Sequence, residues 1–340
     1  MLIFIVSKGC QSCSAVIRQH NARITTLLSA TIMGRLIYGT AWKKEETDKL
    51  VYCALKEGFR ALSTAAQPKY YEEALVALGT TFTPAHDQAV KKLVMTNRTA
   101  AHPGWPCPPT QRTAIPSDCP YDPATSLAEQ VRSSVASSLR NFTFMPSSPG
   151  EAYLDAVILH TPYPTREHTE AVWTALSASV PHPVRRLGIS NVNDKELQQL
   201  LDFCRANPTA AVWPAIVQNR FRDGSARDDD DDDDAFDAAV RNKCRKNGVE
   251  YQAFGVLREK RLLQDQQSVG AVADLAVVSR EASLYALVMA LQDDMAVLDG
   301  TSDPRTMGAD IDDVRKIKGY NERPEWKRAL KSFKEGILEP

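Results

Sequence analysis

Short apolar segments alternate with helical patterns from about residue 34 onward. Eight apolar runs of four to six residues have the length and composition of buried strands. They are Leu36–Thr40, Phe59–Ser63, Leu93–Thr96, Leu154–Leu159, Val184–Ile189, Ala215–Gln218, Val249–Phe254 and Met295–Leu298. The run Leu154–Leu159 is so apolar that both faces of this strand are expected to be covered.

Helical periodicity occupies most of the intervals between these runs. The predicted helices are Glu45–Lys56, Tyr71–Leu78, a segment beginning at Ser126, Arg166–Ala178, and a segment beginning at Asn193. Two of them begin with a capping pair, because Glu129 follows Ser126, and Glu196 follows Asn193, by three residues. In a capping box the two side chains satisfy free backbone donors reciprocally, so the pattern indicates where each helix begins.

Repeated strand–helix units predict a parallel sheet, because parallel neighbours need crossover connections. About eight units in roughly 300 residues fit a closed barrel better than an open sheet with a second domain. No Gly-x-Gly-x-x-Gly motif follows a strand, so the usual sequence argument for a Rossmann fold is missing. We therefore expect an α/β protein in which residues 31–340 form one (β/α)8 TIM barrel.

Residues 1–30 differ from the rest and are expected to form an N-terminal extension, which could be disordered. No acidic residue occurs before Glu45, and Cys10 and Cys13 form a C-x-x-C motif. A dispensable extension or an incorrectly assigned start is the favoured interpretation. An organelle transit segment and a redox site are the alternatives, although a redox pair needs a better strand before it.

Composition and charge exclude several classes of protein. Of the 340 residues, 43% are hydrophobic and 24% charged, as in a globular protein with a sizeable core. The net charge of −1 provides no field that would attract nucleic acid, and no apolar run approaches the roughly 20 residues of a membrane helix. Seven scattered cysteines, an odd number, indicate a reducing compartment. We expect a cytoplasmic monomer without nucleic-acid or membrane partners.

Two segments interrupt the alternation. His102–Pro123 is a proline-rich stretch, which we expect to be a long loop on the substrate face of the barrel. A zinc site made of His102, Cys107 and Cys119 lacks paired ligand spacing, so no metal is expected. Asp228–Asp234 is a run of seven aspartates, whose mutual repulsion predicts a solvated loop.

Six segments near the predicted strand ends are specific when taken together. They are Arg35-Leu-Ile-Tyr-Gly-Thr-Ala-Trp42, Gly58-Phe-Arg-Ala-Leu-Ser-Thr-Ala-Ala-Gln-Pro-Lys-Tyr-Tyr-Glu-Glu-Ala-Leu75, Tyr153-Leu-Asp-Ala-Val-Ile-Leu-His160, Leu187-Gly-Ile-Ser-Asn-Val192, Val217-Gln-Asn-Arg-Phe221 and Leu298-Asp-Gly-Thr301. In this order they resemble the aldo-keto reductase family over about residues 34–315. The stretch that ends at Tyr71 and the proline-rich segment are similar to a fungal-type, NADP-dependent branch of that family.

The resemblance implies a barrel that binds NADP, with NAD as an alternative, and reduces a small-molecule aldehyde or ketone. In that family the nicotinamide supplies a hydride and a tyrosine gives the carbonyl oxygen its proton. Tyr71 matches this tyrosine, and His160 matches the histidine that orients the carbonyl. The family's aspartate and lysine positions are Ser63 and Asn97 here, so the catalytic group is degenerate.

The missing lysine is expected to change the pKa of Tyr71. A cation about 4 Å from a phenol favours the phenolate by about 4 kcal/mol at an effective dielectric of about 20. Without this cation, the pKa of Tyr71 is expected near or above about 10. Arg98 follows Asn97, but the alternation of side chains along a strand should direct it away from the barrel interior. We expect weakened turnover, with alcohol oxidation impaired more than carbonyl reduction.

The resemblance also implies how the nicotinamide would be held. Ser190, Asn191 and Gln218 match the positions that hold its carboxamide. Phe254 matches an aromatic residue that stacks on the ring, and a plain core role is the alternative interpretation.

The segment after the last predicted strand matches the family's site for the adenosine 2′-phosphate, beside a helix N-terminus. Thr301 and Ser302 could donate hydrogen bonds there, and Arg305 could supply charge. Asp299 and Asp303 oppose that charge, so the choice between NADP and NAD stays open.

Three functions are compatible with the sequence. The first is an NAD(P)H-dependent carbonyl oxidoreductase, which the presence of Tyr71 and His160 favours. The second is a non-redox barrel enzyme of biosynthetic metabolism that uses the same two residues as acid and base. The third is a catalytically inactive binding or regulatory homologue. Ser63 and Asn97 favour the second and the third.

Overall fold

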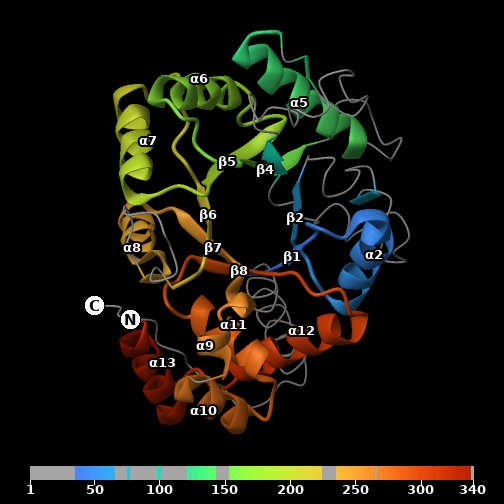
Figure 1. The fold of residues 1–340 in the computed structure, drawn as a ribbon, viewed down its shortest axis with the longest axis vertical. Coiled ribbons are helices and arrows are strands. Elements are labelled where there is room, and N and C mark those ends of the chain that lie inside the picture. The colour runs from blue at the N-terminus through green and yellow to red at the C-terminus, as the bar shows by residue number, and fades with distance from the viewer. Residues whose placement is uncertain are drawn as a thin grey trace, which may run out of the picture.

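Eight parallel strands close into a barrel in chain order, with the helices outside the ring (Figure 1). The computed structural model describes residues 35–65, 75–76, 98–100, 121–122, 124–142, 153–223, 235–264 and 266–337, without the side chains of residues 65 and 98–100. The strands are β1 (Leu36–Gly39), β2 (Leu62–Ala65), β3 (Arg98–Ala100), β4 (Leu154–Leu159), β5 (Val184–Ser190), β6 (Ile216–Arg220), β7 (Glu250–Phe254) and β8 (Met295–Asp299). The predicted (β/α)8 barrel is confirmed.

Six of the predicted strands coincide with observed strands to within two residues at each end, and β2 and β3 differ. The apolar run Phe59–Ser63 predicted β2 three residues early, because Phe59 belongs to the connection that follows the preceding helix. Its ring packs against the ring of Tyr38, with 5.4 Å between the centroids, and its N–H donates to Ala54 O at 2.9 Å. The run predicted as β3, residues 93–96, lies outside the described residues.

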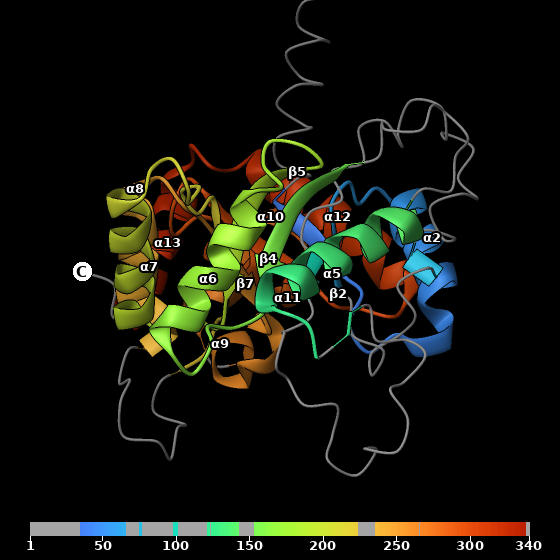
Figure 2. The same cartoon turned by 90° about the horizontal axis from the view of Figure 1, so that it is seen from above.

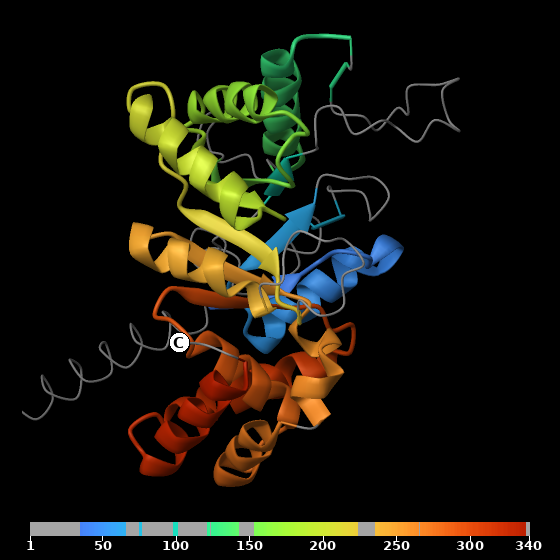
Figure 3. The same ribbon diagram turned by 60° about the vertical axis from the view of Figure 1, so that its left-hand side comes forward.

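The helices surround the strands on all sides of the ring. They are α2 (Thr47–Glu57), α5 (Leu127–Phe142), α6 (Arg166–Ser177), α7 (Asp194–Ala206), α8 (Ala238–Asn247), α9 (Lys260–Gln264), α10 (Gln267–Ala276), α11 (Arg280–Met289), α12 (Pro304–Lys318) and α13 (Pro324–Gly336). Figure 2 shows α5 and α6 in front of the strands and α7 beside them. In Figure 3 the strands lie between these helices and the orange and red helices of the C-terminal part.

The two predicted helix caps are present to different extents. At the start of α7, Asn193 Oδ1 accepts from Glu196 N at 2.8 Å, and the Glu196 carboxylate accepts from Asn193 N at 2.9 Å. The capping box there is complete. At the start of α5, Ser126 Oγ accepts from Glu129 N at 3.3 Å. Of the helix predicted over residues 71–78, residues 75–76 are described and are helical.

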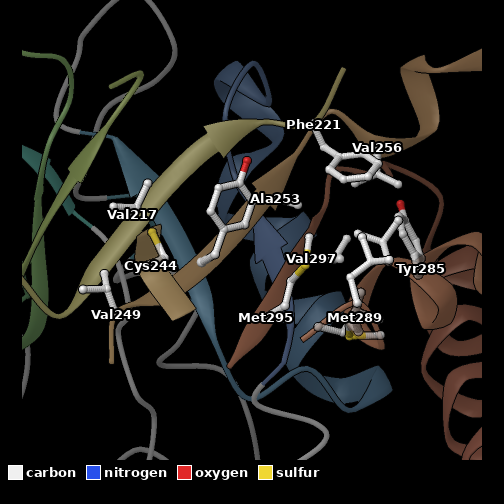
Figure 4. Packing of buried hydrophobic residues seen from close by; sticks show 14 of the residues in the cluster. Val217, Phe221, Cys244, Val249, Ala253, Val256, Tyr285, Met289, Met295 and Val297 are labelled. Carbon is white, nitrogen blue, oxygen red and sulfur yellow. The ribbon is translucent and has the colours of Figure 1, made fainter. Parts of the chain in front are cut away.

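Alternation of side chains along the strands separates an inner from an outer set. Ile37, Ala61 and Ala296 form one small buried cluster, and Ala156, Ile158 and Ile216 form another. The outward-facing residues join the helices in one large core. Figure 4 shows part of it, where Val217, Ala253 and Val297 of neighbouring strands lie among side chains of α8 and α11.

The barrel closes where β1 pairs with β8, and side chains bridge both ends of this pairing. At one end the Arg35 guanidinium donates to Met295 O at 2.8 Å and to Gln292 O at 3.1 Å. At the other end Lys43 Nζ donates to Thr301 O at 3.0 Å, in the loop after β8. These bonds fix the first strand to the last.

The N-terminal residues 1–34, with the C-x-x-C motif, lie outside the described residues. Within the part of the chain that the structure describes, no helix is both long enough and apolar enough to cross a membrane.

Gly188 allows a close approach between β5 and β6. A Cβ atom at this position would lie 2.8 Å from Ile216 O and 3.0 Å from Ile158 Cγ1. The first of these atoms belongs to the backbone of a neighbouring strand, so it cannot move without disturbing the ladder.

We therefore expect Gly188→Ala to lower the free energy of unfolding by about 3 kcal/mol through overpacking. Gly300→Ala is the matched control, because a Cβ atom there meets nothing within 4 Å. Its effect should stay within about 0.5 kcal/mol. Urea denaturation followed by circular dichroism measures both, and equal effects would contradict the packing argument.

Candidate functional site

Polar residues collect at the carboxyl ends of β4, β5 and β6, where barrel enzymes bind their ligands. His160 follows β4, Ser190 ends β5, and Asn191 follows it. The strand register places Ser190 beside Gln218 of β6. Four residues of the predicted site are thus neighbours in the barrel.

Hydrogen bonds join these four residues into one network. Ser190 Oγ donates to Gln218 O at 2.5 Å, and Asn191 N donates to the same oxygen at 3.3 Å. Asn191 Nδ2 donates to His160 O at 2.7 Å and to Ser190 Oγ at 3.2 Å. The network fixes the Asn191 side chain across the ends of β4 and β5, and Ser190 and Gln218 are buried.

Asn191 takes the left-handed backbone conformation, with φ at 53°. Asparagine accepts this conformation more readily than other residues with a Cβ atom. The turn directs the side-chain amide back toward His160. Asparagine at position 191 therefore accommodates the left-handed backbone and also supplies the side-chain amide of the network.

Phe254 ends β7, where the register pairs it with Arg220. It is half-buried, and it belongs neither to the large core nor to the partly buried residues packed against that core. The stacking role that the resemblance implies, with a plain core role as its alternative, stays a prediction.

The loop between β8 and α12 contains Thr301 and Ser302, and the structure adds Lys43 to it. Lys43 Nζ donates to Ser302 Oγ at 2.8 Å, to Thr301 O at 3.0 Å and to Gly300 O. The side chain is largely buried, so it brings a positive charge to the loop from the other side of the barrel seam. Sequence reasoning missed Lys43, although it directly follows the first matched segment.

Arg305 and the two aspartates of this region lie in different environments. The Arg305 side chain is 94% exposed, and its nearest ionic partner is Asp303 Oδ1 at 3.6 Å. Asp303 caps α12 by accepting from Arg305 N at 3.0 Å, a bond that lowers the pKa of its carboxyl. Asp299 is fully buried next to this loop, and the expectation that the two aspartates oppose the charge of Arg305 stays a prediction.

Asp299 belongs to a buried pair of carboxyl groups. Its partner is Asp310 of α12, and both side chains are at most 2% exposed. Asp299 Oδ1 accepts from Thr301 N at 2.9 Å and from Tyr285 Oη at 3.3 Å. One oxygen of each carboxyl, Oδ2, has no donor within the described residues. Burial, and then the charge of Asp299, raises the pKa of Asp310 to about 8, so the two carboxyl groups share a proton at neutral pH.

The degenerate positions are only partly within the described residues. Ser63 is half-buried in β2, and its carbonyl accepts from Thr40 N at 3.0 Å and from Thr40 Oγ1 at 2.9 Å. Tyr71 and Asn97 lie outside the described residues. Arg98 pairs with Thr64 and Val157 in the sheet, and the direction of its side chain also lies outside what the structure describes.

The described residues contain no group of three or more histidine, cysteine, aspartate or glutamate side chains that could hold a metal. The residues considered for zinc, at 102, 107 and 119, and the aspartate run at 228–234 lie outside these residues.

Solved aldo-keto reductases share this fold. An enzyme from Brucella melitensis matches with a TM-score of 0.59 and 17% identity, over 88% of this chain and 94% of its own. A mutant of Gox0644 in complex with NADPH matches with a TM-score of 0.56 and 19% identity, over 84% and 88%. The enzyme MGS-M4, from a Medee basin deep-sea metagenome library, matches with a TM-score of 0.57 and 15% identity, over 83% and 90%. No protein-family model and no curated protein matches the sequence.

Replacing Asn191 should separate the contribution of its side-chain hydrogen bonds from the cost of its left-handed backbone. Asn191→Ala removes the side-chain bonds and keeps the backbone strain, so we expect a loss of about 2 kcal/mol in the free energy of unfolding. Asn191→Gly removes the same bonds but relieves the strain, so its loss should be about 1 kcal/mol. Urea denaturation tests the difference, and equal losses would show that the left-handed backbone carries no cost.

The buried carboxyl pair makes stability depend on pH. The pKa of Asp310 is raised in the folded state, so its stabilising contribution is complete below about pH 4 and is lost as the pH rises through about 8. Asp310→Asn removes this titration and keeps a group that can donate to Asp299. We expect the stability of this variant relative to the wild type to increase by about 2 kcal/mol between pH 5 and pH 8. A difference that does not change with pH in urea titrations would refute the shared proton.

Proposed function

We propose that this chain is an NAD(P)H-dependent oxidoreductase of the aldo-keto reductase type that acts on a small aldehyde or ketone. The observation that carries the proposal is the single network that joins Ser190, Asn191 and Gln218 to the backbone of His160. The resemblance implies that these three residues hold a carboxamide, and they lie in or directly after two neighbouring strands, β5 and β6.

The residues present fit a nicotinamide cofactor. The network offers buried amide and hydroxyl groups for a carboxamide, and the partly exposed Phe254 offers a flat apolar surface for a ring. On the other side of the barrel, Lys43 and the hydroxyl groups of Thr301 and Ser302 offer positive charge and hydrogen bonds to phosphate. One of the neighbouring structures contains NADPH, which supports this assignment.

The cofactor supplies a hydride when it is bound. His160 follows β4, and its backbone carbonyl accepts from Asn191 Nδ2. Its imidazole would orient the substrate carbonyl, as the resemblance implies. Tyr71 would donate the proton to the carbonyl oxygen. Ser63 has no carboxylate to orient a neighbouring cation, and Asn97 supplies no cation, so we propose that turnover is weak.

A second function is a binding protein that takes up the cofactor without turnover. Ser63 favours it, because a half-buried hydroxyl stands where the resembling enzymes have an ionised group. In both functions the cofactor site is retained, so cofactor binding and turnover must be measured separately. The non-redox barrel enzyme has no observation in its favour beyond the same two substitutions.

Titration with NADPH, followed by quenching of tryptophan fluorescence, tests cofactor binding. Trp42 is 60% exposed and immediately precedes Lys43, so it is a suitable reporter. A panel of aldehydes, followed at 340 nm, then tests turnover. Absence of NADPH binding in the folded protein would overturn the proposed function.

Restoring the missing groups should raise turnover. We expect Ser63→Asp/Asn97→Lys to increase NADPH-dependent aldehyde reduction by about 10²-fold or more, since proton transfer by a tuned acid contributes on the order of 10²–10⁴-fold. Ser63→Asn/Asn97→Met is the matched control without charge. A folded Asp/Lys variant that gains nothing over this control would show that the two lost groups do not limit catalysis.

A further inference from the structure

A column of polar side chains runs through the barrel interior beneath Gln218. Gln218 Nε2 donates to Gln252 Oε1 at 3.0 Å, and Gln252 Nε2 donates to Glu250 Oε1 at 2.6 Å. Glu250 Oε2 accepts from Arg186 Nη1 at 3.0 Å, and Arg186 also donates to Asp155. The column thus joins the amino ends of β5 and β7 to the candidate carboxamide site.

The column has a fixed direction of donation. An amide can present either its NH2 group or its oxygen, but a carboxylate can only accept. The Glu250 carboxylate therefore requires that Gln252 point its NH2 group toward Glu250 and its oxygen toward Gln218. That oxygen in turn requires the NH2 group of Gln218. Gln252 is fully buried, so water has no access through which the direction could be reversed.

The direction of the column decides what Gln218 offers to a ligand. One N–H of Gln218 Nε2 is engaged by Gln252, and no described residue donates to Gln218 Oε1, which is the acceptor that the side chain offers. The side chain keeps 7% of its surface exposed, at the level of Ser190 near the carboxyl ends of the strands. A ligand group that reaches this atom must donate a hydrogen bond.

We propose that Glu250, held by Arg186 and acting through Gln252, is a positioning residue that makes the site select the NH2 group of a carboxamide. This inference rests on the proposed function, because it takes the nicotinamide carboxamide as the ligand group. Ligands that have only an acceptor at this position would leave Gln218 Oε1 without a donor, which costs about as much as one lost hydrogen bond.

The test compares NADP⁺ with its 3-acetylpyridine analogue, in which a methyl group replaces the NH2 group. We expect the wild type to bind NADP⁺ about 10-fold more tightly in fluorescence titrations. Glu250→Gln introduces a group that can donate or accept, so both amides above it can turn. The preference should then fall to about twofold or less.

A rescue variant separates positioning from general damage. In Glu250→Gln/Gln252→Glu the acceptor-only group moves one step up the column, so Gln218 must again present Nε2 to it, and the preference should return. Asp155→Asn is the control, since it removes the other carboxylate on Arg186 and leaves the amide column intact. Should Glu250→Gln fail to fold by circular dichroism, Gln252→Met replaces it with the same expectation.

The outcomes are distinct. The positioning role is supported if Glu250→Gln loses the preference for NADP⁺, the rescue variant regains it and Asp155→Asn keeps it. Equal binding of both dinucleotides by the wild type, or an unchanged preference in Glu250→Gln, overturns this role and leaves the proposed function intact. Failure of the folded wild type to bind either dinucleotide overturns the proposed function itself and the inference with it.

Discussion

The hydrogen-bond register of β5, β6 and β7 is the constraint on which the site depends. It places Ser190 beside Gln218 and Gln218 beside Gln252, so that residues distant in sequence share one level of the barrel. The close approach at Gly188 allows the first of these pairings. A shift of one residue would turn every inward side chain outward, and the polar column would lose its partners.

Periodic and local features could be predicted from the sequence. Apolar runs located most strands, and the pair Asn193 and Glu196 located the start of α7, because each depends on neighbours in the chain. Strand β2 was displaced because Phe59 is apolar without belonging to the strand. Its burial results from contact with Tyr38, a tertiary contact that no local pattern records.

The candidate site was predicted only where a resemblance supplied the residues. Lys43 and Glu250 were missed because their relevance comes from what they contact across the barrel, in the loop after β8 and in the interior column. The buried environment of Asp299 was not predicted for a related reason. Alternation along β8 turns it outward toward α12, where it meets a second carboxyl, and the surface loop passes above it.

The loop after β8 helps to hold the barrel closed where β1 pairs with β8. A closed sheet must join its first strand to its last, and here Arg35 fixes one end of that junction while Lys43 fixes the other. An anion that binds beside Lys43 would therefore contact a residue that joins the first strand of the barrel to the last. Occupancy of that position and resistance of the whole barrel to opening are then thermodynamically linked, each strengthening the other.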